Sequence, residues 1–357
     1  MRRQPGRRRE RIDRGIRARS KDVFALSSIR ELSYLYLPLT VFSIALLLFP
    51  LYGESVGRVW VTVMVTTLSF GLLALSWDLL ASAGLTSLGQ ALFYGVGGYT
   101  AGWLARTFDL GPLVTIPLAT VAGALIATAL LAPVLRLRGI YFALITLALP
   151  LLLHRAIDAT RVLGGSEGMA GLPGMPSRSW TVFILAAAFL ITLGSFRRLM
   201  DSDFGIVVRG VAENDRAVMA SGLNIQWVRV KVLLAASIPA AFAGAVMTHN
   251  LRFVGLPVFA LENSVVPLTA VVVGGQGVFW GATLGVMVLV PVSELLRGLG
   301  TLRIVLYSMV LVVWVIALPG GAFHWLRQKY WQKERWVSAD TPVRTDAVPE
   351  RPKELVP

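Results

Sequence analysis

Long apolar segments recur along this chain and alternate with short polar ones, and this pattern predicts the fold. A helix that crosses a hydrocarbon core about 30 Å thick needs roughly 17 to 25 mainly apolar residues. We count about ten suitable segments, so we expect an all-α, polytopic membrane helix bundle. Their approximate ranges are 34–52, 59–80, 86–105, 112–132, 139–154, 180–196, 230–250, 264–279, 280–296 and 304–320.

The predicted spans 264–279 and 280–296 are the weakest pair in this assignment. Four glycines between positions 274 and 281 leave little room for a turn between two full spans. The alternative is that one of the two segments is broken or re-entrant.

The distribution of positive charge predicts the orientation of the spans, because cytoplasmic loops carry the excess of Lys and Arg. With the N-terminus inside, the cytoplasmic segments hold 26 of the 34 positive residues and the outer segments hold eight. Merging residues 264–296 into one span would place the C-terminal tail, with its seven positive residues, outside. We therefore expect both termini, and the polar segment 197–229, on the cytoplasmic side.

The two ends of the chain differ from the apolar part in composition. Residues 1–33 carry eleven Arg or Lys, and residues 328–357 mix both signs of charge with four prolines. Such segments bury too little apolar surface to offset the entropy of ordering. We expect cytoplasmic, disordered tails at 1–33 and 328–357, flanking a transmembrane domain at 34–327.

Overall composition excludes several classes of protein. Of the 357 residues, 55% are hydrophobic and only 15% are charged, which is too apolar for a soluble domain. The net charge of +14 does not require a nucleic-acid partner, because the basic residues lie at the ends of apolar runs and in the tails, where they meet anionic lipid. Cysteine is absent, so the sequence offers no thiol nucleophile or cysteine metal site.

Candidate chemistry within the spans is sparse. The sequence has no phosphate-binding Gly-Lys-Ser/Thr loop, and His154, His249 and His324 are far apart, so we expect neither an ATPase site, nor a metal site, nor a cofactor. Asp78 and, near a span end, Glu294 are the candidate intramembrane carboxylates. Asp78 could line a transport path, or it could pair with a neighbouring hydroxyl or backbone group. We favour the structural interpretation, because Asp78 lies near its span end.

Glycine spacing predicts close packing between helices. Gly98 with Gly102, Gly281 with Gly285, and the series Ala119, Gly123 and Ala127 follow the small-xxx-small pattern. In addition, GQALFYG (89–95) is echoed by GQGVFWG (275–281), and both lie at the cytoplasmic end of a predicted span. An internal duplication is one interpretation, and chance is the other.

The polar segment 197–229 contains one short helix signal. Asn214 can cap a helix, Asp215 suits the positive end of the helix dipole, and Gly222 can supply the left-handed residue that ends it. We expect about two helical turns at 215–221. A helix this short is marginal in water and would need a docking partner. The pattern alone favours an ordinary cytoplasmic loop that packs on its own bundle, and docking on a partner is the alternative.

Five segments together resemble one family, in the right order over about residues 59–325. They are SLGQALFYGVGGYTAGWLA (87–105), LRLRGIYFALITLALPLLL (135–153), GGSEGMAGLPG (164–174), GVAENDRAVMASGLNIQWVRVK (210–231) and VVVGGQGVFWGATLG (271–285). They resemble the permease subunits of branched-chain amino acid ABC importers, most closely the M-type. Many members look to carry His where this chain has Gln90, and urea-type permeases share much of the pattern.

The resemblance implies a subunit of the cell inner (plasma) membrane with three kinds of protein partner. These are a second permease subunit, two cytoplasmic ATPase subunits and an extracytoplasmic substrate-binding protein, in addition to membrane lipid. The implied cargo is a branched-chain or related amino acid, with a small amide such as urea as an alternative. An ion-coupled secondary transporter of a small polar solute and a membrane enzyme are the other classes, and no catalytic constellation supports the enzyme.

Two groups of candidate site residues follow. The resemblance places the ATPase-coupling helix in the polar segment and implies that role for Arg209, Glu213, Asp215, Ala217 and Gly222. The glycine-rich spans and the echoed motif suggest candidates for the transport path, which are Asp78, Ser87, Gln90, Tyr94 and Gln276.

Overall fold

The computed structural model describes residues 7–13, 41–50, 57–137, 139–277, 279–296 and 332–338, with a few isolated positions between 302 and 321. The chain divides into two units, one made of Ser28–His324 and one made of the two chain ends, Met1–Ser27 with Trp325–Pro357. We describe each unit by itself.

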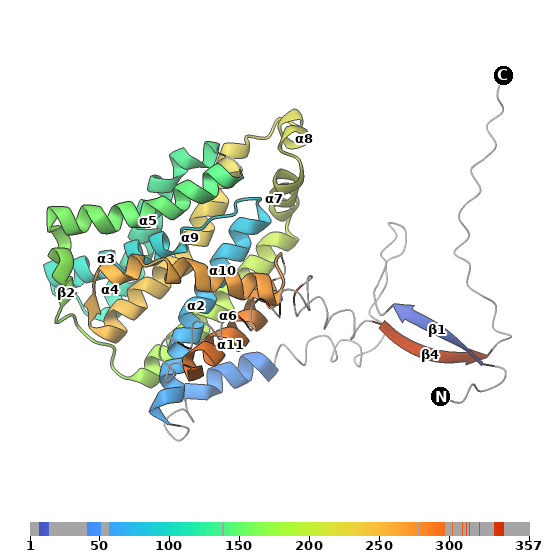
Figure 1. The fold of residues 1–357 in the computed structure, drawn as a ribbon, viewed down its shortest axis with the longest axis horizontal. Helices are drawn as coiled ribbons and strands as arrows, with labels where there is room; N and C mark the ends of the chain where they lie inside the picture. The colour runs from blue at the N-terminus through green and yellow to red at the C-terminus, as the bar shows by residue number, and fades with distance from the viewer. Residues whose placement is uncertain are drawn as a thin grey trace. The chain divides into compact units, whose positions relative to one another are not determined.

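The larger unit is a helical bundle (Figure 1). Its main helices are α2 (Arg58–Ser82), α3 (Gln90–Phe108), α4 (Pro112–Leu131), α5 (Ile140–Thr160), α6 (Arg178–Asp201), α7 (Asp203–Glu213), α8 (Asp215–Ala220), α9 (Ile225–Leu251), α10 (Glu262–Gly274) and α11 (Phe279–Leu295). Three short 3-10 helices join them, η1 (Ala132–Arg136), η2 (Val162–Glu167) and η3 (Leu256–Phe259), and a further apolar helix covers Val41–Pro50.

Six helices of the described part of the chain are long and apolar enough to cross a membrane. They are α2, α4 with η1, α5, α6, α9, and η3 with α10. The structure thus confirms a mainly helical, membrane-type fold, while the count of about ten spans stays a prediction. The predicted span 304–320, except for isolated positions, and nine of the nineteen residues of 34–52 lie outside the described residues.

Three predicted spans form helices that fall outside these six, and one of them is the short helix Val41–Pro50. α3 is 19 residues long, but Gln90, its glycines and its tyrosines make it less apolar than the others. Most of α3 is buried inside the bundle, where it packs against α4 and α9. α11 covers 17 residues and is separate from α10, so the segment 264–296 forms two helices rather than one merged span.

Glycine contacts hold the centre of the bundle together, as the small-xxx-small spacing predicts. A Cβ at Gly97 would overlap the backbone of Ala241 in α9, and one at Gly123 of α4 would lie 2.9 Å from the Gly97 Cα. At a second contact, a Cβ at Gly285 of α11 would overlap the carbonyl of Ala270 in α10. These helices therefore touch through their backbones.

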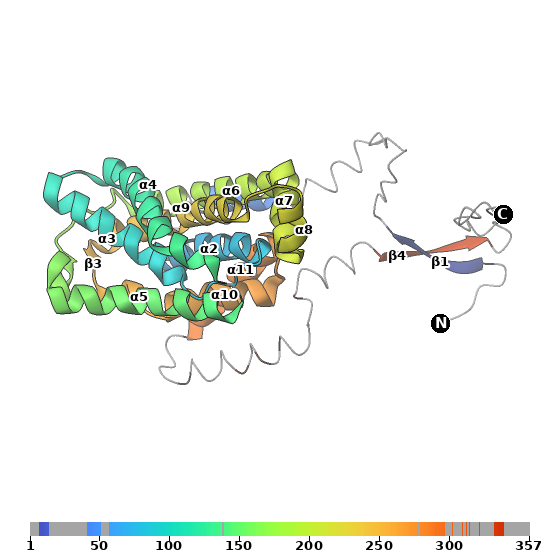
Figure 2. The same cartoon turned by 90° about the horizontal axis from the view of Figure 1, so that it is seen from above.

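The helices differ in how far they are enclosed. In its most apolar stretch, α2 has 67% of its residues buried, whereas α5 has 17%. Both views place α5 along the edge of the bundle (Figures 1 and 2). The outward residues of α5 are mostly large and apolar, as a helix facing lipid requires.

The polar connections lie at opposite ends of this unit. α7 and α8 are at one end, and the short strand pair β2 (Met169–Ala170) with β3 (Phe253–Val254) is at the other (Figures 1 and 2). Leu172 extends that pair by donating its N–H to the Arg252 carbonyl at 3.3 Å. His249 of α9 adds a hydrogen bond of 2.7 Å between Nδ1 and the Pro173 carbonyl.

The smaller unit contains one antiparallel strand pair, β1 (Arg7–Asp13) with β4 (Gln332–Ser338). Its register sets Glu10 opposite Arg335 and Arg11 opposite Glu334. Opposite charges directly across a pair of strands attract each other. This strand pair stands beside the mainly helical fold of the larger unit, and the predicted disorder of the two tails stays a prediction. The domain limits at 33 and 328 stay predictions.

Candidate functional site

The polar segment 197–229 folds into two short helices between α6 and α9. The second, α8, is the predicted one, and the first, α7 (Asp203–Glu213), was not predicted. Its signal is present in the sequence, because Phe204, Val208 and Val211 recur at intervals of three and four residues. Val208 and Val211 are buried, so α7 packs its apolar face on the bundle.

The ends of α8 agree with the prediction. The Asn214 side-chain oxygen accepts hydrogen bonds from the backbone N–H groups of Arg216 and Ala217, at 3.1 and 3.3 Å. Gly222 has a φ of +83°, in the left-handed region. The helix ends at Ala220, one residue before the predicted limit. None of its six residues is fully buried, and Val218 is the partly buried side chain through which α8 packs against the core.

Arg229 of α9 fastens α8 to the bundle. Its Nη2 donates to Asp215 Oδ2 in an ion pair of 3.0 Å, and its Nη1 donates to the Leu135 carbonyl at 3.2 Å. The side chain of Arg229 is 6% exposed and that of Asp215 is 15% exposed. Arg229 was not among the predicted site residues, although a cation between Val228 and Val230 in an apolar segment is a usable signal.

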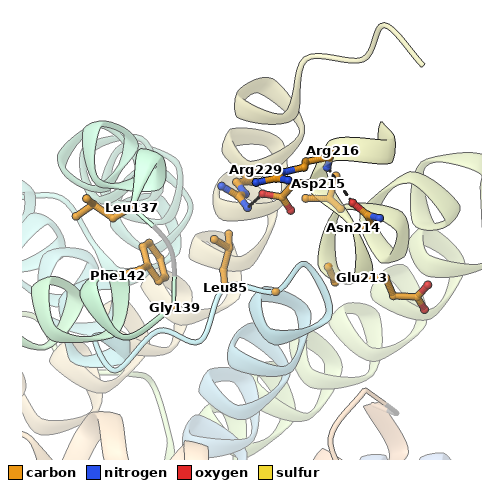
Figure 3. A pocket seen from close by; sticks show the side chains of 12 residues that line it. Leu85, Leu137, Gly139, Phe142, Glu213, Asn214, Asp215, Arg216 and Arg229 are labelled. Atoms are coloured by element: carbon orange, nitrogen blue, oxygen red, sulfur yellow. Dashed lines mark hydrogen bonds and ion pairs between the residues drawn. The ribbon is translucent and has the colours of Figure 1, made fainter. Parts of the chain in front are cut away.

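A cavity of about 310 Å³ lies beside this ion pair (Figure 3). Leu85, from the connection between α2 and α3, forms one wall with Leu137 and Phe142, and the polar segment with Arg229 forms the other. The twelve lining residues are Gly84, Leu85, Leu137, Gly139, Phe142, Val211, Ala212, Glu213, Asn214, Asp215, Arg216 and Arg229. The cavity therefore joins an apolar side to a charged one.

The five predicted coupling residues have different environments. Asp215 is tied to Arg229, and Arg209 donates to the Met200 carbonyl at 2.6 Å, which secures α7 to the last turn of α6. Glu213 is exposed at the cavity. Ala217 and Gly222 are exposed away from the cavity lining. Asp215 and Glu213 are thus brought to one cavity, and the other three are not.

The first Gly-Gln motif lies buried at the start of α3. Ser87 is 1% exposed, its carbonyl accepts from Trp77 Nε1 at 2.7 Å, and its hydroxyl accepts from the Gly89 N–H at 3.1 Å. Gln90 is fully buried, and its Oε1 accepts from the Ser76 hydroxyl at 3.2 Å. Among the described residues, Gln90 Nε2 has no partner.

The second motif reaches the same part of α2 through its backbone. The Gly277 N–H donates to Asp78 Oδ1 at 2.7 Å, while the Gln276 side chain is exposed. This contact agrees with the structural interpretation of Asp78, although Asp78 Oδ2 is buried without a partner among the described residues. Tyr94, the remaining path candidate, is half-buried one turn along α3 from Gln90.

Among the described residues, no group of three or more His, Asp or Glu side chains could hold a metal ion. The fold and the polar segment together define a helical membrane protein with a small helical projection at one end of its bundle. The chain belongs to the family described as branched-chain amino acid transport system / permease component, whose model matches residues 59–318.

Three curated relatives carry matching names. The high-affinity branched-chain amino acid transport system permease protein LivM of Salmonella typhimurium is 27% identical over 298 residues, which are 74% of this chain and 70% of the relative. The protein of the same name from Escherichia coli K12 is 26% identical over 79% of this chain and 74% of the relative. A probable LivM of Methanocaldococcus jannaschii is 32% identical over 122 residues, which are 33% of this chain and 35% of the relative. No solved structure matches the chain significantly.

Proposed function

We propose that this chain is a transmembrane subunit of an ABC importer that moves branched-chain or related amino acids into the cytoplasm. In this proposal two separate ATPase subunits supply the energy, a second permease completes the pathway, and an extracytoplasmic binding protein delivers the substrate. Family membership supports the transport role. The particular partners, the inner-membrane location and the cargo are part of the proposal.

The proposed ATPase coupling is supported by the exposure of α8 and by its attachment to the bundle. This helix is capped at Asn214, buries none of its residues and is fastened to α9 through Asp215. Its Met219 is 49% exposed, and Leu223, shortly after the helix, is 44% exposed. A two-turn helix with exposed apolar side chains gains little from this chain, and docking on a partner would supply the missing contacts.

Co-purification tests this function. Wild-type chain expressed with its second permease should retain both ATPase subunits and show substrate-stimulated ATP hydrolysis. Gly222→Val should lose ATPase binding, because a β-branched residue at φ +83° costs about 1–3 kcal/mol and displaces the end of α8. Gly194→Val is the matched control, since a Cβ there meets nothing within 4 Å and the backbone is helical. ATPase binding by Gly222→Val at the wild-type level would contradict the docking role.

A second function has one observation in its favour. Asp78 is buried in a membrane helix with one carboxylate oxygen unpartnered among the described residues, as a coupling-ion site requires. An ion-coupled carrier would transport as the single chain in liposomes under a proton or sodium gradient. An ABC permease would not, and would require ATP and its partners.

The proposed orientation has its own test. Ser166 and Ser221 are exposed and belong to opposite ends of the bundle, and the chain has no cysteine of its own. Cysteine introduced at Ser166 should react with an impermeant reagent from outside, and cysteine at Ser221 should not. The reverse result would overturn the orientation.

A further inference from the structure

Arg229 is an unusual residue for its place in α9. It lies in the second turn of the helix, 5% exposed, while Lys231 two positions later is exposed. A guanidinium that is removed from water is destabilising unless it is paired and hydrogen-bonded. Two other elements supply bonds to Nη1 and Nη2, while Nε has no partner among the described residues.

Those two bonds come from segments that are distant in the sequence. Asp215 belongs to the first turn of α8, and Leu135 belongs to η1, the continuation of α4. The planar fork of an arginine can hold a carboxylate and a carbonyl at once in fixed directions. Arg229 therefore joins the ends of three elements, α8, α9 and η1, at one point (Figure 3 shows the pair with Asp215).

The three joined elements continue into the bundle as closely packed helices. α4 and α9 pack along each other, and Ser237 of α9 donates to the Ala124 carbonyl of α4 at 3.3 Å and shares a contact of 3.1 Å with Thr128. Close-packed helices move together rather than deforming. A displacement of α8 would therefore act on both helices through Arg229.

We infer that Arg229 is a positioning residue for energy coupling, which transmits the movement of α8 to the adjoining ends of α4 and α9. This inference rests on the proposed function, because it takes α8 as the element that an ATPase subunit moves. In the absence of Arg229, α8 would keep its cap and its exposed face but would lose its link to the bundle.

The test uses the assembled importer in proteoliposomes and measures substrate transported per ATP hydrolysed. In Arg229→Met, an apolar side chain of similar length replaces the guanidinium, and Asp215, whose side chain is 15% exposed, keeps its access to water. We expect ATPase co-purification and basal hydrolysis to persist, while transport per ATP falls at least about tenfold. Arg229→Lys, which keeps the charge but not the fork, should lose less, and Lys231→Met, on the same helix, should equal wild type.

The measurements distinguish a positioning role of Arg229 from a merely structural role. They also distinguish failure of this inference from failure of the proposed function. If hydrolysis and transport fall together, or if both stay at wild-type levels, the positioning role is wrong. Should Arg229→Met fail to assemble, the ratio for Arg229→Lys decides in the same way. If the wild-type chain binds no ATPase subunit, the proposed function fails instead.

A spectroscopic measurement complements this ratio. Spin labels on cysteines at Ala217 in α8 and Arg136 in η1 report the separation of the two elements, and both positions are exposed. In the wild-type background we expect the same separation with and without ATP. In Arg229→Met the separation should change when ATP binds, and an unchanged separation would contradict the proposed link.

Discussion

The two Gly-Gln motifs are similar in sequence, yet they contact α2 in different ways. The first buries its glutamine, and Gln90 receives a hydrogen bond from Ser76. The second exposes its glutamine and uses a backbone N–H, from Gly277 to Asp78. Trp77, between these two positions, bonds to the segment before the first motif. One stretch of α2 therefore carries contacts to both motifs, by a side chain in one case and by the backbone in the other.

This difference follows from where the helices begin. α3 starts at Gln90 itself, whereas α11 starts at Phe279, three residues after Gln276. Gly89 is pressed against the carbonyl of Thr146, but Gly277 has open space where a Cβ would lie. Two motifs of similar sequence thus form different sites. Their contacts do not support a symmetric transport path.

The largest effect is expected at the crowded glycine of the first motif. In Gly89→Ala, the new Cβ would overlap the Thr146 backbone, which cannot rotate away, and the cost should be about 1–3 kcal/mol or more. Thermal unfolding in detergent should show a clear loss of stability. Gly194→Ala, in open space, is the control, and equal stability of the two variants would contradict the packing.

Two substitutions at Asp78 distinguish a structural contact from a transport role. Asp78→Leu leaves the Gly277 N–H without its acceptor and should destabilise the chain by about 1–3 kcal/mol. Asp78→Asn retains an acceptor oxygen, so we expect near-wild-type stability and uptake. If Asp78→Asn folds normally but abolishes uptake, the carboxylate has a transport role and the structural interpretation is wrong.

The two glutamines should respond unequally to truncation. Gln90→Ala removes a buried side chain and its bond with Ser76, which should cost about 1–2 kcal/mol. Gln276→Ala changes an exposed side chain and should stay within about 0.5 kcal/mol of wild type. Unfolding midpoints of the two variants, compared in one detergent, check this. Equal losses would mean that the motifs are equivalent after all.

The smallest effect is expected at the open glycine of the second motif. Gly277 has a φ of +79°, which asparagine tolerates better than other side chains. Gly277→Asn should therefore cost less than about 1 kcal/mol. Gly277→Val should cost more through backbone strain alone. The difference in unfolding midpoint between these two variants measures the backbone strain at position 277. Equal midpoints would contradict that strain.

Hydrophobic pattern predicted the helices well and their contacts poorly. Nine of the ten predicted spans contain helices among the described residues, because an apolar run of this length is a local property of the sequence. α7 was missed because a short amphipathic helix in a polar segment needs a surface to pack on. The strand pair β1 with β4 was missed because it joins the two ends of the chain.

The candidate site shows the same division. The Asn214 cap and the positive φ of Gly222 were predictable, since each depends on a few neighbouring residues. The role of Arg229 was not predictable, because it depends on contacts with Asp215 and Leu135, which are 14 and 94 positions away. Likewise, a hydropathy pattern cannot tell that Gln90 is buried and Gln276 is exposed.

Gly84, at the cavity edge, has a consequence for how sequences of this family can vary. Its φ is +73°, and a Cβ there would lie 3.2 Å from the Cα of Ala212 in α7. A larger residue at either position would push α7 away from the connection between α2 and α3. Positions 84 and 212 should therefore change together among relatives, with a small residue kept at one wherever the other grows. An alignment in which they vary independently would show that relatives space these two segments differently.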